Sequence, residues 1–222
     1  MAHEINNPLA IINEKAGLLK DLVQYTDNFS QKDKVMNLAV SITGSVDRCS
    51  KVTHRLLGFA KRMEDNIEVV DLKLLLHEVV GFQNSEINHR NLKINFDITD
   101  DLPTIESDRG QLQQVFLNII NNALAAVEDG GEIHISVTRG ANDKVAVSIT
   151  DNGSGIAEEN LQHIFEPFYS TKGQFGTGLG LSITRDIVNK LGGTIDVQSV
   201  LGEGTRFIIM LPLVPGKAVF RE

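Results

Sequence analysis

A heptad pattern of apolar residues runs through the first third of the chain and constrains the fold more than any other feature. In the first stretch the repeating positions are Ile5, Leu9, Ile12, Ala16, Leu19 and Val23. In the second stretch they are Val35, Leu38, Ile42, Cys49, Val52, Leu56, Phe59 and Met63, with Ser45 as the one interruption. Apolar residues at alternating steps of three and four predict helices that pack along a narrow seam. Because a polar break at residues 26–33 separates the stretches, we expect a helical hairpin.

The hairpin has more apolar surface than one antiparallel partner can cover. The additional apolar positions are Ile11, Leu18 and Leu22 in the first helix and Val46, Leu57 and Ala60 in the second. Two hairpins joined in a four-helix bundle would bury both stripes, so we expect a homodimer. Docking of the hairpin onto the rest of its own chain is the alternative.

After residue 63 the pattern changes to capped helices and alternating strands. The predicted helices span 72–83, 108–127 and 179–191, and the predicted strands span 92–98, 132–139, 144–151, 194–200 and 205–211. Asp71 is expected to cap the first of these helices, and Asp108 with Gln111 forms a capping box for the second. The fold class is therefore α+β. Residues 1–66 form the hairpin, and residues 67–222 form an α/β sandwich whose mixed, largely antiparallel sheet has helices on one face.

Composition excludes several classes of protein. The chain has 222 residues, 41% of them hydrophobic, and a net charge of −8, which disfavours nucleic acid as a partner. Its single cysteine allows no intrachain disulfide, so a reducing, cytoplasmic compartment fits best. No apolar run approaches the roughly 20 residues that span a bilayer. We expect no membrane contact by this segment, and this expectation leaves open a membrane anchor upstream.

Two glycine-rich stretches are suited to a nucleotide. Residues 176–181 open a predicted helix, where backbone amides and the helix dipole attract an anion. Residues 151–156 follow a predicted strand, and there the carboxylate of Asp151 can accept a hydrogen bond from an exocyclic amine. The alternatives are a ligand-free turn for the first stretch and a calcium-like loop for the second, although no bidentate acid closes that loop at the EF-hand spacing. The first stretch fits neither a Rossmann nor a P-loop motif.

Two further segments carry polar groups of interest. Asn118 and Asn122 are four residues apart on one predicted helix, so they project from one face, and a carboxamide oxygen is a suitable ligand for Mg²⁺. Exposed asparagines without a ligand are the alternative. Residues 165–172 combine aromatic side chains, which we interpret as a hydrophobic clasp for a loop, with Lys172, which is able to reach phosphates.

Together, in this order and spacing, residues 108–123, 151–156, 165–172 and 176–181 resemble the N, G1, F and G2 boxes of the ATP-binding domain of two-component histidine kinases. Their superfamily has the Bergerat-type fold and includes type II topoisomerases, mismatch-repair ATPases and a heat-shock chaperone. The resemblance implies ATP and Mg²⁺ as cofactors, with Asp151 on the adenine amine and with Mg²⁺ on Asn122, near Asn118. The other implied nucleotide-binding residues are Gly153, Gly155, Ile156, Lys172, Gly176, Thr177, Gly178, Leu179, Gly180, Leu181 and Thr205.

The segment His3-Glu4-Ile5-Asn6-Asn7-Pro8-Leu9 resembles the H box of the same family. The resemblance implies that His3 is autophosphorylated from ATP and passes the phosphoryl group to an aspartate of a response-regulator receiver domain. Glu4 would orient the imidazole or accept its proton, and Asn7 would orient a water molecule for regulator-phosphatase activity. Because His3 falls in the first turn of its helix, we expect that the sensor and part of this helix are missing from the chain.

The sequence departs from the family pattern at two places, and two other functions are considered. Ala125 stands where many relatives have a lysine, and only residues 173–175 separate Lys172 from Gly176, which predicts a short lid. Both departures suit the subclass typified by nitrogen-regulatory kinases. The other hypotheses are an ATP-binding dimerisation scaffold without phosphotransfer and a clamp ATPase of the chaperone or mismatch-repair kind. Histidines 54, 77, 89, 134 and 163 are expected to be structural.

Overall fold

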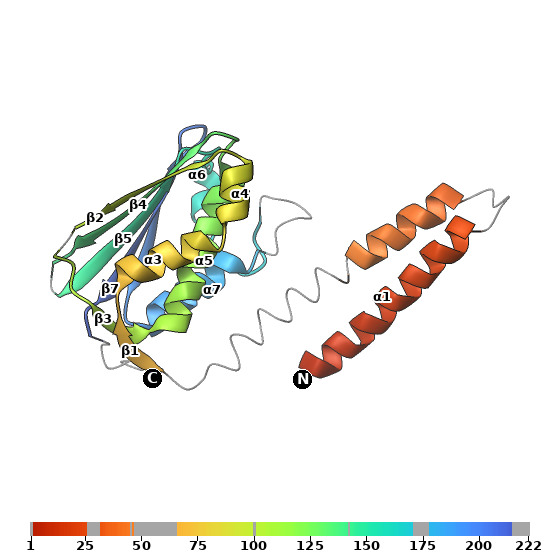
Figure 1. The fold of residues 1–222 in the computed structure, drawn as a ribbon, viewed down its shortest axis with the longest axis horizontal. Helices are drawn as coiled ribbons and strands as arrows, with labels where there is room; N and C mark the ends of the chain where they lie inside the picture. The colour runs from red at the N-terminus through yellow and green to blue at the C-terminus, as the bar shows by residue number, and fades with distance from the viewer. Residues whose placement is uncertain are drawn as a thin grey trace. The chain divides into compact units, whose positions relative to one another are not determined.

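The computed structural model describes residues 2–25, 32–44, 46, 66–99, 101–141, 143–170 and 178–214 (Figure 1). The chain divides into two compact units, Met1–Glu64 and Asp65–Glu222.

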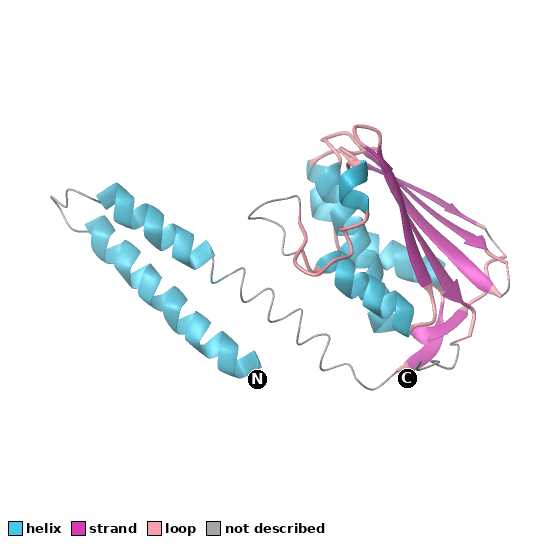
Figure 2. Ribbon diagram, turned by 180° about the vertical axis from the view of Figure 1, so that it is seen from behind, coloured by secondary structure: helices cyan, strands magenta, loops and turns pink. Residues whose placement is uncertain are grey.

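The first unit contains helices where the heptad pattern predicts them. Helix α1 spans Ala2–Tyr25, and residues 32–44 are also helical. The two helices lie side by side in both views (Figures 1 and 2). The rest of the predicted second helix, residues 47–63, lies outside the described residues. The described part therefore agrees with a helical hairpin.

Within a single chain only part of the predicted seam is buried. Ala16 and Val23 of α1 are buried as predicted, whereas Ile12 and Leu19 are 45% and 42% exposed. In the second helix the buried residues are Ala39 and Val46, one heptad apart, whereas the predicted Leu38 and Ile42 are 56% and 40% exposed. The buried residues are thus alanines and valines, whereas the exposed ones are leucines and isoleucines.

The second unit contains a five-stranded sheet in the order β2-β4-β5-β7-β6. The strands are β2 (Lys93–Ile98), β4 (Glu132–Arg139), β5 (Lys144–Asp151), β6 (Thr194–Val200) and β7 (Gly204–Pro212). Strand β2 runs parallel to β4, and the other neighbouring pairs are antiparallel. Three helices cover one face of this sheet (Figure 2): α3 (Leu72–Gly81), α5 (Arg109–Ala126) and α7 (Gly180–Lys190). The predicted α/β sandwich is confirmed.

Four short elements were not predicted from the sequence. Strand β1 (Ile67–Val70) pairs antiparallel with β3 (Ile105–Asp108) in a separate two-stranded sheet. Helices α4 (Asn84–His89) and α6 (Glu158–Leu161) are also brief. Elements of four to six residues are too short to establish a periodic pattern, so their tertiary contacts define them.

Helix α5 is fixed at both ends. At its start Asp108 Oδ1 accepts the backbone amide of Gln111 at 2.9 Å, and Gln111 Nε2 donates to Asp108 Oδ2 at 2.8 Å, which confirms the capping box. At its end Arg90 donates to the carbonyl oxygens of Leu124 at 2.7 Å and Val127 at 2.6 Å. Since the guanidinium also donates to Asp129, the pKa of Arg90 is raised and its charge is secure.

The core lies between this helix layer and the sheet. Its largest fully buried side chains come from α3, α5 and strands β3, β4 and β5, among them Leu76, Phe116, Ile119, Ile135 and Ile149. Asp71 caps α3 as predicted, because its Oδ1 accepts the amide of Leu74 at 3.0 Å. Within the described residues no helix combines the length and the apolar character that crossing a bilayer requires.

Candidate nucleotide site

The carboxylate predicted to hold the adenine lies at the end of the central strand β5. Asp151 is paired in register with Thr205 of β7, and each residue is only 5% exposed. Asp151 Oδ1 accepts the backbone amide of Gly153 at 2.9 Å. This bond turns the chain sharply after β5 and holds the carboxylate beside the glycine loop, residues 151–156.

Ser199 completes this end of the site, and sequence reasoning missed it. Its Oγ lies 2.9 Å from Thr205 Oγ1, donates to the carbonyl oxygen of Gly204 at 2.8 Å and accepts the amide of Ile156 at 2.8 Å. Ser199 therefore ties the turn between β6 and β7 to the glycine loop. Ser199 is the residue opposite Thr205 in the register of β6 and β7. The predicted pairing of these two strands was therefore the signal in the sequence that could have indicated Ser199.

Two glycines permit this packing. Gly204 has φ +123°, and a Cβ there would lie 2.0 Å from the carbonyl oxygen of Asp151. Gly155 has φ +67°, and a Cβ there would lie 2.0 Å from the carbonyl oxygen of Val200. Both positions exclude side chains, so the loop and the hairpin touch through their backbones.

One face of α5 extends the site away from Asp151. Asn118, Asn122 and Ala126 recur every four residues, so they share this face and span about 12 Å along the helix. At one end the amide of Ser154, in the glycine loop, donates to the carbonyl oxygen of Ala126 at 3.1 Å. At the other end Asn118 Nδ2 donates to the carbonyl oxygen of Gly180, at the start of α7, at 3.4 Å. Asn122 lies between these two contacts.

The donor set on this face fits a magnesium nucleotide. Asn122 is half-buried, and its side chain makes no hydrogen bond to any described residue, so its carboxamide is available to a ligand. Among the described residues no cluster of His, Cys, Asp or Glu is placed to hold a metal. A cation here would be held by neutral oxygens, and Mg²⁺ that retains waters and binds phosphates suits such a site. Ala125 is exposed and adds no charge.

The segment before the second glycine stretch differs from the predicted aromatic clasp. Phe168 is 74% exposed, so it packs on little, and its backbone has φ +67°. Its amide donates to the carbonyl oxygen of Gly178 at 2.9 Å, so the contact that joins the segment to the start of α7 is made by main chain. Phe165 lies under the guanidinium of Arg185, 5.5 Å from the ring centre, and Tyr169 donates to Asn160.

The structure does not describe several of the predicted site residues, or does not describe their side chains. Lys172, Gly176 and Thr177, with the lid predicted to be short, lie outside the described residues. His3, Glu4 and Asn7 belong to the first turns of α1, but their side chains are not described. Gly178 and Leu179 precede α7, and Gly180 and Leu181 begin it, as predicted.

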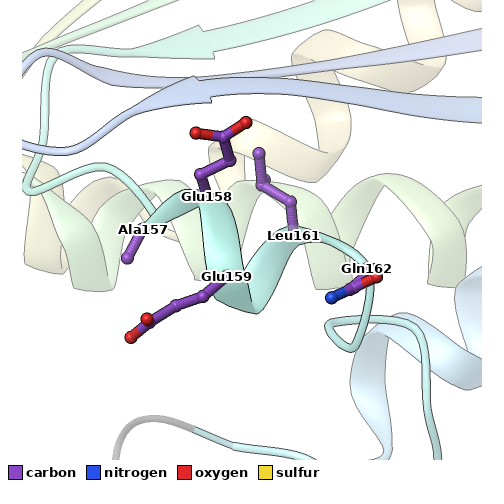
Figure 3. A pocket seen from close by; sticks show the side chains of 5 residues that line it. All are labelled: Ala157, Glu158, Glu159, Leu161 and Gln162. Atoms are coloured by element: carbon purple, nitrogen blue, oxygen red, sulfur yellow. The ribbon is translucent and has the colours of Figure 1, made fainter.

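The residues that line a pocket at α6 include none of the predicted site residues (Figure 3). The pocket is lined by Ala157, Glu158, Glu159, Leu161 and Gln162. Two carboxylates would repel the phosphates of a nucleotide, which have the same sign of charge. The region from Asp151 along α5, and not this pocket, is therefore the candidate nucleotide site.

The fold and the site define an ATP-binding domain. Residues 107–215 match the family of histidine kinase-, DNA gyrase B- and HSP90-like ATPases. Sensor histidine kinase ZraS of Escherichia coli O157:H7 is 35% identical over 213 residues, which cover 96% of this chain and 45% of that protein. This chain thus spans less than half the length of that relative.

Solved structures agree with the sequence comparison. The catalytic domain of histidine kinase ThkA is 34% identical with a TM-score of 0.62, and the match covers 68% of this chain and 97% of that domain. ThkA in complex with the response regulator protein TrrA matches 96% of this chain and 60% of its own, with 29% identity and a TM-score of 0.69. Full-length ShkA in complex with AMPPNP matches 98% of this chain and 45% of its own, with 27% identity and a TM-score of 0.73. The chain belongs to the histidine kinases of two-component signalling.

Proposed function

We propose that this chain is the catalytic core of a protein-histidine kinase that autophosphorylates His3 from Mg·ATP and passes the phosphoryl group to an aspartate of a response regulator. The observation that carries the proposal is the buried pair of Asp151 and Thr205 at the end of an α5 face that presents Asn118 and Asn122. Residues 1–66 would be the dimerisation and phosphotransfer hairpin, and residues 67–222 the ATP-binding domain. Both would work in the cytoplasm.

In this proposal the nucleotide lies along the face of α5. Asp151 accepts a hydrogen bond from the adenine amine, next to Thr205, and the base rests against the backbone at Gly153 and Gly155. The phosphates lie toward Asn122 and the start of α7, where Lys172 and the amides of residues 176–181 add positive potential. The carboxamide of Asn122, with Asn118 nearby, would hold Mg²⁺, and the ion would supply positive charge to offset that of the phosphates. The small residue at position 125 and the short lid agree with a nitrogen-regulatory subclass.

The phosphoryl acceptor is the imidazole of His3. A neutral imidazole, with an ordinary pKa of about 6.5, is a nucleophile at pH 7. A bond forms between the ring nitrogen and the γ-phosphorus while the bond to the β–γ bridging oxygen breaks, and ADP leaves. Glu4 orients the ring or accepts the proton from its other nitrogen. Since neighbouring residues on a helix point about 100° apart, the Glu4 side chain must bend toward the ring.

Asn7 is proposed to act in the reverse direction of signalling. It is four residues after His3 in α1, so the two positions fall on the same side of the helix. Its amide would orient a water molecule for attack on the acyl phosphate of the regulator. This regulator-phosphatase activity requires the hairpin but not transfer from ATP.

The partners follow from the two parts of the chain. ThkA, to which this chain is similar, has been seen in complex with a response regulator, and we propose the same class of partner here. A homodimer through the hairpin is supported by its exposed apolar side chains, which include Ile12, Leu19, Leu38 and Ile42. A second copy of the hairpin would bury them in a four-helix bundle.

Incubation with ATP labelled on its γ-phosphate tests the function. We expect an acid-labile, base-stable phosphoprotein that is absent in His3→Gln. ATP binding without any label would instead favour the dimerisation scaffold. Steady release of phosphate that survives His3→Gln would favour the clamp ATPase.

A further inference from the structure

The hydroxyl of Thr184 is completely buried between α7 and α5. The residue is 0% exposed, and its Oγ1 donates to the carbonyl oxygen of Gly180 one turn earlier at 2.8 Å. The same hydroxyl accepts a hydrogen bond from Asn118 Nδ2 at 3.2 Å. A buried hydroxyl is costly unless it is hydrogen-bonded, and here both its donor and one of its lone pairs are used.

This contact decides which way the amide of Asn118 points. Gly180 offers a carbonyl oxygen, which can only accept, so the Asn118 atom that faces it at 3.4 Å must be the nitrogen. The hydroxyl of Thr184 donates its proton to Gly180, so the Thr184 oxygen can only accept, and it accepts a hydrogen bond from the Asn118 nitrogen. Both contacts therefore hold the NH₂ group against α7. The carboxamide oxygen is on the other branch of the same planar group and is directed away from Gly180 and Thr184.

An apolar residue at position 184 would remove the shorter of the two hydrogen bonds that orient the Asn118 amide. Valine has nearly the same shape as threonine but has no hydroxyl. Asn118 would then keep only the longer contact with Gly180, so one weak hydrogen bond instead of two would hold the orientation of its amide. Packing alone does not require threonine here, since the neighbouring buried positions of α7 include Ile183, Ile187 and Val188.

We propose that Thr184 is a positioning residue for the magnesium–phosphate end of the nucleotide site. It acts through Asn118, whose oxygen it keeps directed toward the face of α5 that Asn122 shares. A hydrated Mg²⁺ on the ATP phosphates would meet this oxygen through a ligand water. The inference rests on the proposed nucleotide function and adds that α7, through Thr184, orients a side chain of the proposed Mg²⁺ site.

The test compares Thr184→Val with Thr184→Ser, which restores the hydroxyl, in the full chain. The side-chain amide resonance of Asn118, assigned by its loss in Asn118→Asp, reports the contact without any nucleotide. We expect this resonance to shift and its exchange with solvent to accelerate in T184V but not in T184S. A fluorescent ATP analogue titrated at several Mg²⁺ concentrations reports the site. We expect roughly five- to tenfold weaker binding in the presence of Mg²⁺ for T184V, recovery in T184S, and little change for ADP without Mg²⁺.

Two results would overturn the inference. One is a T184V protein whose amide resonance and Mg²⁺-dependent affinity equal those of the wild type. The other is a T184S protein as weak as T184V, because packing and not the hydroxyl would then be responsible. If T184V does not fold, Thr184→Ala replaces it with the same expectations. A wild-type protein that binds no ATP would contradict the proposed function itself. Unexpected results confined to the Thr184 variants would contradict only the role of Thr184.

Discussion

Asp151 and Thr205 face each other across β5 and β7, with both side chains almost completely removed from solvent. Ser199 connects Thr205 to the amide of Ile156, and Gly153 donates to Asp151, so the carboxylate, the hydroxyl and the glycine loop form one hydrogen-bonded unit. Such a unit is rigid before a ligand arrives. A rigid site loses little conformational freedom on binding, which favours affinity.

Replacing Asp151 by Asn is expected to weaken ATP binding roughly 10- to 100-fold while the fold is retained. Asparagine keeps an oxygen for the amide of Gly153 but loses the charge that strengthens the bond to the adenine amine, and such bonds contribute about 1.5–3 kcal/mol. Titration with a fluorescent ATP analogue measures the change, and circular dichroism checks the fold. Asp196→Asn, at an exposed position on β6, is the matched control. Wild-type affinity in D151N would remove Asp151 from the site.

Gly204→Ala and Gly202→Ala separate a steric conflict from backbone strain. Both glycines have positive φ, +123° and +84°, but a Cβ meets the carbonyl oxygen of Asp151 only at position 204. We expect G202A to cost about 1 kcal/mol and G204A at least about 3 kcal/mol. Thermal denaturation should show roughly 2–4 °C per kcal/mol for a domain of this size. Equal melting temperatures in the two variants would contradict the close approach of β7 to Asp151.

Arg90→Met should destabilise the second unit by about 2 kcal/mol, because it leaves the carbonyl oxygens of Leu124 and Val127 without their donor. Urea denaturation measures the free energy of unfolding. Lys93→Met, which removes a cation from an exposed pair with Glu132, is the control and should change little. A similar effect in both variants would mean that Arg90 contributes only its charge.

The pKa of Lys93 is raised, chiefly by its 2.8 Å hydrogen bond to Glu132. Because the folded pKa exceeds the unfolded one, any stability from this pair is present below the ordinary lysine pKa. It is lost as pH rises through the raised value. Glu132→Gln should therefore return the pKa of Lys93 toward its ordinary value, as measured by NMR titration of the side chain. An unchanged titration would show that the ion pair does not persist in solution.

Leu38→Glu and Ile42→Glu are expected to convert a dimer into a monomer at micromolar concentration. Both side chains are exposed in the single chain, and a charge there would be buried against a second hairpin. Sedimentation velocity measures the change, with Asn37→Glu, at an exposed polar position of the same helix, as the control. A wild-type chain that sediments as a monomer would rule out the dimer.

Sequence predicts the parts of this protein that depend on local chemistry. Asp71 and Asp108 cap helices through residues three positions away, so their motifs are legible in the chain. The strands of the main sheet alternate clearly and were found almost to the residue. Asn118 and Asn122 stand out because asparagine is an indifferent helix former and the two residues share one face of α5.

The remainder depends on contacts between distant residues. Thr184 and Asn118 are 66 positions apart, and nothing near either residue in the sequence indicates that they meet. The role of Ser199 appears only once the register of β6 and β7 is known. In the hairpin the heptad pattern located the helices, but it did not distinguish the residues that are buried within one chain from those that are exposed there.

The path of the chain through α5 limits how this protein can vary. The helix lies in the connection between the parallel strands β2 and β4, and Asp108 and Arg90 hold its two ends. One inserted residue would rotate the following part of the helix by about 100° relative to the preceding part. Either Asn118 or Asn122, or the carbonyl oxygens bound by Arg90, would then lose their present positions. Insertions and deletions in α5 should therefore be far less tolerated than at the β4–β5 turn, where a reporter peptide could be spliced without disturbing the helix.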